Sequence, residues 1–538
     1  MNSEHTLTVV SDDKRIELPI RRGENVFNVL SDSGFADLDA PCGGSGLCGK
    51  CLVEVIGDDP CQIHPDERRL LSSQQLQSHQ RLCCRMFLTE DADLTISVVS
   101  RKEGAKIVSS YENDETYHRE RRSFSTPSYA FASDIGTTTV VVYCVSLETG
   151  EIIDHRSSLN PQSSFGADVI SRIEYSREHE TGLSALHEVI AHHLHSLMMQ
   201  MMDVHHIHPQ EVKEIVAVGN PTMIHFLLKK DPAGIAVAPF IPSFYSRQQL
   251  TGTDVGWDDL SDASLIIPGL VSAYIGSDIT AGVCSTDMLS FGKRTLYIDI
   301  GTNGEIVLFD GKTLHCCSSA AGPAFEGASI SCGIGAVRGA IDHIWLDASQ
   351  NVCFSTIDSA PPAGICGSAV VETVALLLDL GLIDETGAME HEGNPADRYL
   401  TDTPNGKAFK ITETMTFSNK DIREVQLAKA AIAAGCELLL KEADIELSQL
   451  DSLIIAGGFG AYINIEKAKR IGLLPPLESE KITAVGNAAG KGALDILLYE
   501  GADDRTENIR SKARYIELSN SPQFNEMFID QMFFQEGW

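Results

Sequence analysis

No run of 18 consecutive apolar residues occurs in this 538-residue sequence, and its first twenty residues show no basic segment followed by a long apolar one. The first absence excludes a membrane-spanning helix and the second a secretory signal, so we expect a cytoplasmic protein. Basic residues are also in short supply: 42 Lys and Arg stand against 75 Asp and Glu, a formal net charge of −33. Because nucleic acids are polyanions, this balance disfavours a DNA or RNA partner and favours one with a basic face.

The cysteine content does not predict a disulfide framework. The sequence has fourteen cysteines and no secretory signal, so we expect reduced thiols or metal ligands. At roughly 100–200 residues per domain, the length predicts three or four packing units.

Periodicity divides the chain into a small N-terminal part and a large α/β part. Residues 1–100 predict a β-rich domain, and residues 101–128 are polar and aperiodic, as in a linker. From residue 129 onward, buried strands alternate with helices, which is the α/β pattern. The expected elements are a hairpin at 6–10 and 15–20, a helix at 25–33, strands at 52–56, 94–99, 129–135, 140–145, 215–218, 296–300, 306–309 and 453–455, and long helices at 183–202 and 422–440.

Five cysteines cluster near the N-terminus. Cys42, Cys48 and Cys51 follow a C-x5-C-x2-C spacing in a glycine-rich loop, and Cys83 and Cys84 follow some thirty residues later. Three thiolates on one loop plus a distant fourth predict a [2Fe–2S] cluster, whereas structural zinc usually takes paired C-x2-C knuckles. The long loop with an R-L-x-C segment resembles ferredoxins of the adrenodoxin and putidaredoxin type. That resemblance implies that Cys84 is the fourth ligand.

Three glycine-rich elements follow buried strands in the large part. They are SDIGTTT at 133–139, DIGTNGE at 299–305 and IIAGGFG at 454–460. The first two share a strand, Asp-Ile-Gly-Thr, strand pattern, which is a weak internal repeat. A D-x-G-T turn offers backbone N–H groups and hydroxyls to phosphate, and its Asp can hold the waters of Mg²⁺. The sequence lacks G-x-x-x-x-G-K-[ST], which excludes a P-loop.

Taken in order, these elements resemble the phosphate and adenosine motifs of the superfamily of acetate and sugar kinases, Hsp70 and actin (ASKHA). The resemblance implies a two-lobed ATPase, with lobes at 129–294 and 295–520 and a C-terminal tail at 521–538. It implies that Asp134 and Asp299 hold the waters of Mg²⁺. It implies that the phosphates contact Gly136, Thr137, Thr138, Gly301, Thr302, Asn303 and Gly304. It implies that the adenosine is bordered by Gly457, Gly458 and Gly460.

Longer stretches resemble a narrower family, the reductive activators of corrinoid-dependent enzymes. They are VGNPTMIHFLL (218–228), APFIPSF (238–244), AYIGSDITAG (273–282), YIDIGTNGEI (297–306), AAGPAFEGASIS (320–331), GICGS (364–368), KAAIAAG (429–435), IIAGGFGAYIN (454–464) and IGLLPP (471–476). The implied fold is a β-grasp ferredoxin joined by the linker to the ATPase. The implied activity is ATP-dependent, one-electron reduction of cob(II)amide to cob(I)amide in a methyltransferase or O-demethylase system. The implied partners are a corrinoid protein, a low-potential electron donor and a second copy bound through the ATPase domain.

Other polar residues in these stretches have less certain roles. Asp278 is either the N-cap of a helix or a further carboxylate facing the nucleotide. Asn220 ends a strand, where a ligand crevice or a plain turn fits equally well. Glu326 is a candidate for the nucleotide or the partner, and Ser318 with Ser319 for a partner surface.

Other functions remain open from the residues alone. A ferredoxin-fused ASKHA kinase would phosphorylate a metabolite, and an ATP-regulated electron carrier would reduce another low-potential acceptor without requiring ATP. An activator of the 2-hydroxyacyl-CoA dehydratase type would carry a [4Fe–4S] cluster between subunits, for which Cys366 is the one tempting ligand.

Overall fold

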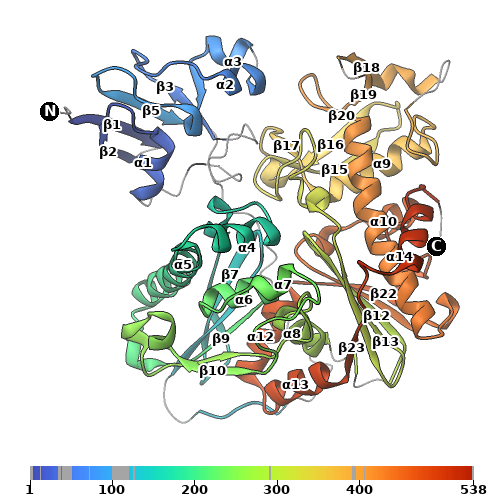
Figure 1. The fold of residues 1–538 in the computed structure, drawn as a ribbon. Coiled ribbons are helices and arrows are strands. Elements are labelled where there is room, and N and C mark those ends of the chain that lie inside the picture. Colours follow the sequence, from blue (N-terminus) through green and yellow to red (C-terminus); the bar gives the residue numbers. More distant parts are fainter. Residues whose placement is uncertain are drawn as a thin grey trace. The chain divides into compact units, whose positions relative to one another are not determined.

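The computed structural model describes residues 4–11, 14–33, 38, 51–71, 73–99, 120–124, 128–286, 288–289, 292–389, 395–404 and 406–535. The chain divides into two units, one formed by residues 1–104 with 161–182 and the other by residues 105–160 with 183–538 (Figure 1).

The N-terminal unit is built on a mixed five-stranded sheet in the order β2-β1-β5-β3-β4. Strand β1 forms a hairpin with β2 and pairs in parallel with β5, which pairs antiparallel with β3. In β5, Leu94, Ile96 and Val98 are buried and alternate with half-buried residues, because successive side chains point to opposite faces. The elements of this unit are β1 (Glu4–Ser11), β2 (Lys14–Arg21), α1 (Val26–Asp32), β3 (Leu52–Val55), α2 (Pro65–Leu70), α3 (Ser73–Gln77), β4 (Gln80–Leu82), η1 (Cys83–Arg85), β5 (Leu94–Val98), η2 (Pro161–Ser164) and α4 (Val169–Glu178).

The predicted hairpin, first helix and two strands of this unit are confirmed. The sequence analysis missed α2, although His64 caps it, Pro65 begins it and Glu67 completes a capping box. Glu67 is fully buried and forms a two-point ion pair with buried Arg81, at 2.9 Å to each of its carboxylate oxygens. This pair anchors β4, the strand that leads into Cys83 and Cys84, against α2.

Two six-stranded sheets form the frame of the large unit, and they have the same plan. Their orders are β10-β11-β9-β6-β7-β8 and β22-β21-β12-β13-β14-β23. In each, the strand that ends in Asp-Ile pairs in parallel with one neighbour and forms an antiparallel hairpin with the next. The structure therefore confirms the internal repeat: two copies of one strand pattern, each placing an Asp-Ile-Gly-Thr turn at the same end of its sheet.

The bounds of the first sheet's elements are β6 (Tyr129–Ile135), β7 (Thr139–Ser146), β8 (Ile152–Leu159), α5 (Gly182–His205), η3 (Pro209–Glu211), β9 (Val212–Gly219), α6 (Pro221–Leu227), α7 (Ala233–Ala236), β10 (Gln248–Thr251), η4 (Gly252–Val255), η5 (Asp258–Leu260), β11 (Ser264–Ile267) and α8 (Ser277–Thr286). Those of the second are β12 (Thr295–Ile300), β13 (Gly304–Phe309), β14 (Leu314–Ser319), η6 (Pro323–Glu326), α9 (Gly367–Asp379), α10 (Asn419–Glu442), η9 (Leu447–Gln449), β21 (Ser452–Ala456), η10 (Gly460–Tyr462), α11 (Ile465–Arg470), η11 (Ser479–Lys481), β22 (Ile482–Gly486), α12 (Ala488–Leu498), α13 (Ala502–Lys512), β23 (Ala513–Tyr515) and α14 (Pro522–Asp530).

Helices α8 and α12 pack against each other between the two sheets (Figure 1). Their close crossing requires a glycine on α12, since a Cβ at Gly492 would lie 2.1 Å from the carbonyl oxygen of Ala281. Helix α12 also contacts β6 and β9, so the C-terminal part of the chain completes the core around the first sheet.

Two small sheets add to the second large sheet, and the sequence analysis did not anticipate them. Their orders are β16-β15-β17 and β18-β19-β20. Most of their strands are short, and β16 is half-buried throughout and β18 nearly so, so these two lack the alternation that identifies strands elsewhere. The bounds are β15 (Ala340–Leu346), β16 (Val352–Thr356), η7 (Ile357–Ser359), β17 (Gly364–Ile365), η8 (Pro395–Tyr399), β18 (Leu400–Thr403), β19 (Gly406–Lys410) and β20 (Thr416–Ser418).

The C-terminal segment is ordered by contacts with α10. Buried Lys429 of α10 donates to the carbonyl oxygen of Phe533 at 2.6 Å, and Gln426 donates to that of Met532 at 2.8 Å. Burial lowers the pKa of Lys429 to about 8. Residues at the end of the predicted linker also pack on the large unit: Arg122 pairs with Glu214 at 2.6 Å.

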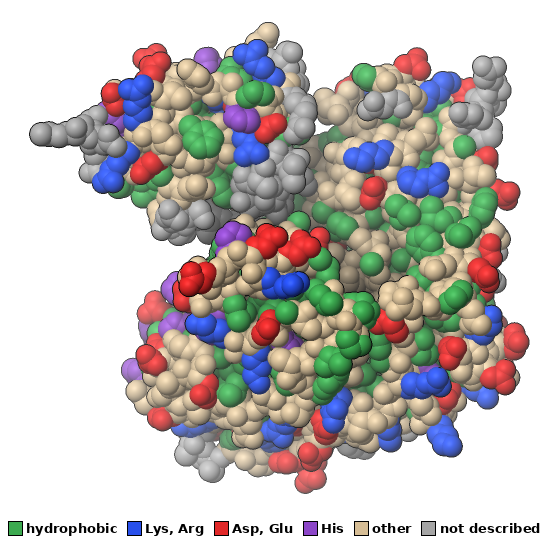
Figure 2. Space-filling model, viewed as in Figure 1, with side chains coloured by type: hydrophobic (Ala, Val, Ile, Leu, Met, Phe, Trp, Pro, Cys, Tyr) green, Lys and Arg blue, Asp and Glu red, His purple; other side chains and the backbone are tan. Residues whose placement is uncertain are grey.

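No helix among the described residues is long and apolar enough to cross a membrane. Figure 2 shows acidic and basic side chains scattered over the visible face instead of gathered into one patch.

His225 is expected to cost the large unit stability as the pH falls from 7 to 5, in opposition to the buried aspartates of the same unit, whose raised pKa values stabilise the fold on acidification. The His225 side chain is fully buried in α6, its Nδ1 donates to the Pro221 carbonyl, and its Nε2 accepts from the Ser243 N–H. Burial lowers the pKa of His225 to about 4, from an ordinary value of 6.5. The unfolded chain therefore binds a proton as the pH falls through 6.5 and the folded chain does not, which costs on the order of 2 kcal/mol by pH 5.

Urea unfolding at pH 7 and pH 5 measures this loss, with His225→Phe as the comparison. The variant is less stable at both pH values, but its stability should change more favourably on acidification than that of the unaltered protein. An equal change in stability in the two proteins would rule out this contribution of His225.

Candidate functional site: a cysteine pair and a carboxylate-rich double hairpin

In the N-terminal unit, the fold brings Cys51 and Cys84 together. Cys51 precedes β3 and Cys84 follows β4, and these strands pair with Leu52 opposite Leu82. The two sulfur atoms lie 3.2 Å apart, both thiols are buried, and they form no disulfide. Two adjacent buried thiols suit a shared soft metal ion. Cys42 and Cys48 lie outside the described residues.

Cys83 differs from its neighbour in its surroundings. It is completely buried in the hydrophobic core of the sheet, and its backbone N–H donates to the Cys51 carbonyl at 2.8 Å. Its backbone therefore aligns the cysteine segments, while Cys84 provides the sulfur facing Cys51. Cys61 is also a buried thiol without a disulfide.

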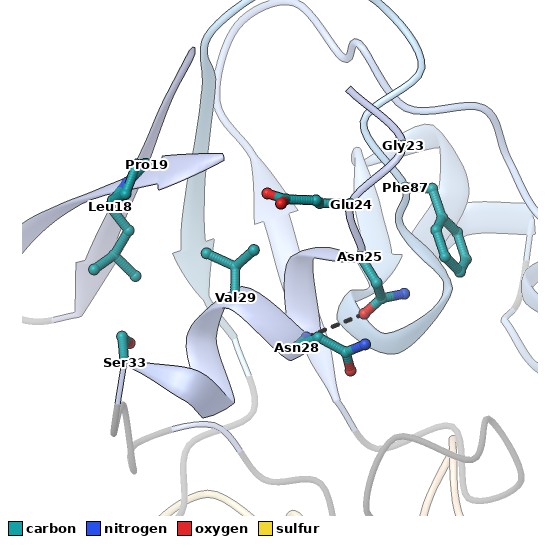
Figure 3. A pocket seen from close by; sticks show the side chains of 9 residues that line it. All are labelled: Leu18, Pro19, Gly23, Glu24, Asn25, Asn28, Val29, Ser33 and Phe87. Carbon is teal, nitrogen blue, oxygen red and sulfur yellow. Dashed lines mark hydrogen bonds between the residues drawn. The ribbon is translucent and has the colours of Figure 1, made fainter. Parts of the chain in front are cut away.

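A hollow of about 560 Å³ lies in this unit between β2, α1 and Phe87 (Figure 3). Asn25 on its wall accepts a hydrogen bond from the Asn28 N–H and donates one to the Cys84 carbonyl at 3.1 Å. The hollow contains none of the predicted site residues, and the nucleotide motifs belong to the other unit. Its connection to the cysteine pair is through Asn25.

In the large unit, the tips of the two Asp-Ile-Gly-Thr hairpins meet. The hydroxyls of Thr138 and Thr302 lie 3.3 Å apart, although 164 residues separate them. The turns are closed by hydrogen bonds from Gly136 N–H to the Thr139 carbonyl and from Gly301 N–H to the Asn303 carbonyl. The two turns that the sequence predicts to bind phosphate therefore face one another across a short distance.

Three predicted aspartates converge behind these turns. Asp134 and Asp299 are the penultimate residues of β6 and β12, and Asp278 is in the first turn of α8. Each side chain is half-buried, and burial is the main cause of the shift in its pKa. Burial raises the pKa of Asp134 to about 7, of Asp278 to about 8 and of Asp299 to about 6, and mutual repulsion adds to the first two.

Asp278 lies close enough to Asp134 and Asp299 for their charges to raise its pKa, and its Oδ1 also accepts the Ile279 N–H at 2.8 Å. No three His, Cys, Asp or Glu side chains within the described parts of the chain lie close enough together to hold a bare metal ion. The carboxylates instead suit an ion that keeps its waters, as Mg²⁺ does.

The sequence analysis missed several residues of this carboxylate cluster. Glu305 on β13 faces the aspartates, and burial raises its pKa well above the usual range, with repulsion from Asp278 and Asp299 adding to the effect. Tyr297 donates to Asp299, and Asn487, the N-cap of α12, hydrogen-bonds to Asp134. Glu305 stands two residues past Asn303 in the second hairpin, so alternation along the strand could have identified it.

Some residues of the two Asp-Ile-Gly-Thr turns face the opposite hairpin, and others contact side chains elsewhere in the unit. Thr137 accepts a hydrogen bond from the Asn220 amide at 2.9 Å, and Asn220 also caps α6. The Asn303 side chain hydrogen-bonds to Glu305. A Cβ at Gly304 would lie 2.8 Å from Ile432, so this glycine permits close packing on α10.

The three glycines of the third element have different surroundings. Gly457 has a φ of +91°, and a Cβ there would lie 2.8 Å from the Asp299 carboxylate. Gly460, the first residue of η10, packs against Ile455 of β21, while Gly458 has open space where a side chain would be. Gly458 therefore offers the exposed backbone that an adenosine could approach.

Ser318 and Ser319 lie on β14 beside the second hairpin. Ser318 donates to Glu305, and Ser319 is buried and donates to the Gly304 carbonyl at 3.3 Å. The expectation that both line a partner surface is wrong for Ser319, because β14 turns this side chain into the protein.

Glu326 is the residue on which the two hairpins converge. Its Oε2 accepts hydrogen bonds from the Thr302 hydroxyl at 2.8 Å and from the Thr138 hydroxyl at 3.2 Å. The Thr302 backbone N–H also donates a hydrogen bond to Glu326. Burial raises the pKa of Glu326, although these hydrogen bonds act to lower it.

Comparisons with known proteins cover nearly the whole chain. The model described as the C-terminal, ASKHA domain of RACo matches residues 293–537, that of the RACo middle region residues 129–290, and that of the 2Fe-2S iron-sulfur cluster binding domain residues 9–89. The corrinoid activation enzyme RamQ of Eubacterium limosum is 34% identical, over 76% of this chain and 71% of its own length.

Two further matches agree. The [Co(II) methylated amine-specific corrinoid protein] reductase of Methanosarcina barkeri is 26% identical, over 75% of this chain and 76% of its own. A solved structure of a reductive activator for corrinoid, iron-sulfur protein is 28% identical, with a TM-score of 0.71 over 98% of both chains. The predicted fold class, a [2Fe–2S] ferredoxin domain fused to an ASKHA ATPase, is confirmed.

Proposed function

Because the chain belongs to the family of reductive activators of corrinoid-dependent enzymes, we propose that it reduces the inactive cob(II)amide of a corrinoid protein to cob(I)amide at the expense of ATP. The observation that carries the proposal is the fusion of a cysteine pair fit for an iron–sulfur cluster with two facing phosphate-binding hairpins on one chain. The domain division given from the sequence, 1–100, 101–128, 129–294, 295–520 and 521–538, remains part of this proposal.

In this proposal the ferredoxin domain supplies the electron. Cys42, Cys48, Cys51 and Cys84 hold the [2Fe–2S] cluster, and the 3.2 Å separation of the Cys51 and Cys84 sulfurs supports their binding to the same iron. The bound cluster would accept and release single electrons. Asn25 and the Glu67–Arg81 pair hold the Cys84 segment in place from two sides.

In the ATPase domain, Thr138 and Thr302 donate to phosphate oxygens, and Asp134, Asp278 and Asp299 hold the waters of Mg²⁺. Bound Mg²⁺ would neutralise phosphate charge and relieve the repulsion that adds to burial in raising the pKa values of Asp134 and Asp278. Gly458 provides room for the adenosine.

ATP is needed because the electron must move uphill. Plant-type [2Fe–2S] centres lie near about −400 mV, and each 59 mV of unfavourable gap costs about a factor of ten for one electron. ATP changes that balance only by binding one conformation better than another. We propose that closure of the hairpins around ATP alters the complex with the corrinoid protein, for instance the coordination of cobalt.

Spectroscopy of the corrinoid tests this function. Chemically reduced protein is mixed with a cob(II)amide corrinoid protein, with and without Mg-ATP, and the cob(I) absorption is followed. We expect cob(I) to accumulate in the presence of Mg-ATP, with inorganic phosphate as the product. Equal reduction without ATP would indicate an ATP-regulated carrier instead, and a phosphorylated small molecule would indicate a kinase.

A homodimer through the ATPase domain and a low-potential electron donor complete the proposal. Supporting the dimer, exposed Leu427, Ile529 and Phe533 lie on or just after α10 and α14, where Figure 2 shows hydrophobic side chains gathered. Light scattering of the purified chain gives its mass and tests the dimer directly.

A further inference from the structure

The backbone around Glu326 and the residue before it fix the position of Glu326. It ends η6, which is enclosed by Gly322 and Gly327 with φ values of 76° and 77°. The preceding residue, Phe325, is buried and stacks on Phe459 of the adenosine element at 5.1 Å between ring centres and an interplanar angle of 11°. All three nucleotide elements thus contact the two residues Phe325 and Glu326.

The contacts of Glu326 place its carboxylate where a terminal phosphate group belongs. Its Oε2 accepts hydrogen bonds from both hairpin hydroxyls, the donors assigned above to phosphate. A hydroxyl has one proton to donate, so Thr138 and Thr302 cannot serve Glu326 and a phosphate oxygen at once. ATP binding must therefore release the carboxylate from one or both threonines.

Once released, Glu326 stays close to the phosphate because Phe325 remains packed against Phe459. A carboxylate and a phosphate are both acceptors and cannot bond to each other directly, and their charges repel. A water molecule between them solves both problems, since it donates to the carboxylate and presents its oxygen to phosphorus. The Glu326 side chain is the ionisable group best placed for this, because Asp134, Asp278 and Asp299 face the cation side.

We propose that Glu326 is the catalytic base of ATP hydrolysis in this protein, an inference that rests on the proposed function. The water oxygen forms a bond to the γ-phosphorus while the bond from that phosphorus to the β–γ bridging oxygen breaks. The electron pair of that bond leaves with ADP, and the water proton passes to the Glu326 carboxylate and then to solvent. ADP and inorganic phosphate are the products, with no oxidant or reductant consumed.

The test is Glu326→Gln, which preserves size and hydrogen-bond acceptance but removes the base. We expect its kcat for phosphate release to fall about 100-fold or more, the range for loss of a general base. Its Kd for Mg-ATP should not weaken, since one negative charge is removed from beside the triphosphate. Glu326→Asp keeps a carboxylate and should recover part of the rate.

Glu437→Gln is the matched control, because it neutralises another half-buried glutamate of the same lobe, on α10 away from the hairpins. It should hydrolyse ATP within about twofold of the unaltered protein. If Glu326 were a structural tie between the hairpins, Glu326→Gln would change the Kd and the melting temperature but leave kcat within threefold, and the inference would be overturned. If the unaltered protein bound no ATP, the proposed function would fail together with it.

Discussion

Replacing Cys84 with Ala is expected to abolish the iron–sulfur cluster, whereas the same replacement at the adjacent Cys83 should leave it in place. The Cys84 sulfur lies 3.2 Å from that of Cys51, and Cys83 is buried in the hydrophobic core of the sheet. Three remaining thiolates cannot complete a [2Fe–2S] site, so iron and sulfide should fall to near zero per chain. ATP-dependent corrinoid reduction should be lost with them.

The pair of variants separates ligation from packing. Cys83→Ala removes one buried sulfur and costs on the order of 1 kcal/mol of stability through a small cavity, without touching the ligand. Iron analysis and the electron paramagnetic resonance signal of the reduced protein distinguish the two outcomes. A cluster that survives in Cys84→Ala and disappears in Cys83→Ala would reverse the ligand assignment.

ATP hydrolysis offers an internal control for the same variants. The nucleotide residues lie in the large unit and the cysteine pair in the N-terminal unit. Cys84→Ala should therefore retain Mg-ATP binding with an unchanged Kd. Loss of ATP binding in this variant would mean that the substitution had disrupted the fold instead of the cluster.

The sequence predicted the frame of the molecule well because its strands carry strong local signals. The strands at 129–135 and 295–300 are buried apolar runs that end in Asp-Ile-Gly-Thr, and they form where expected. Helix α14 carried signals too: Ser521 caps it, Pro522 begins it, and Phe524, Met527 and Phe528 follow at helical spacing. The sequence analysis assigned residues 521–538 to a C-terminal tail and did not use these signals.

The centre of the site was harder to predict because its contacts join distant parts of the chain. The bond between Thr138 and Glu326 spans 188 residues, and the motif around Glu326 does not reveal it. Asn487 is similarly distant from Asp134, and its Asn-Ala-Ala surroundings suggest a helix cap and nothing more. Local patterns identified the two Asp-Ile-Gly-Thr turns that are predicted to bind phosphate. Which acidic residues lie behind these turns depends on how the two sheets pack together.

Asp299→Asn is expected to make the nucleotide-free protein more stable and, at the same time, to remove most of its ATPase activity. Burial raises the pKa of Asp299 to about 6, and its charge also raises those of Asp134 and Asp278. Without a cation, these crowded carboxylates destabilise the fold, so neutralising one should add on the order of 1 kcal/mol, a typical gain for a relieved active-site group. Asp134→Asn should behave in the same way.

The cost of that gain appears when Mg-ATP is added. With one carboxylate lost, the waters of Mg²⁺ are held less firmly, and kcat should fall at least about 100-fold, as for other lost electrostatic contacts in active sites. Thermal unfolding with and without Mg-ATP measures both effects: the variant should begin from a higher melting temperature and gain less from the ligand. Asp530→Asn, which neutralises an exposed aspartate at the end of α14, should change neither quantity. A lower melting temperature for nucleotide-free Asp299→Asn would show that contacts of Asp299 stabilise the fold. It would contradict the view that the carboxylates destabilise the protein until a cation binds.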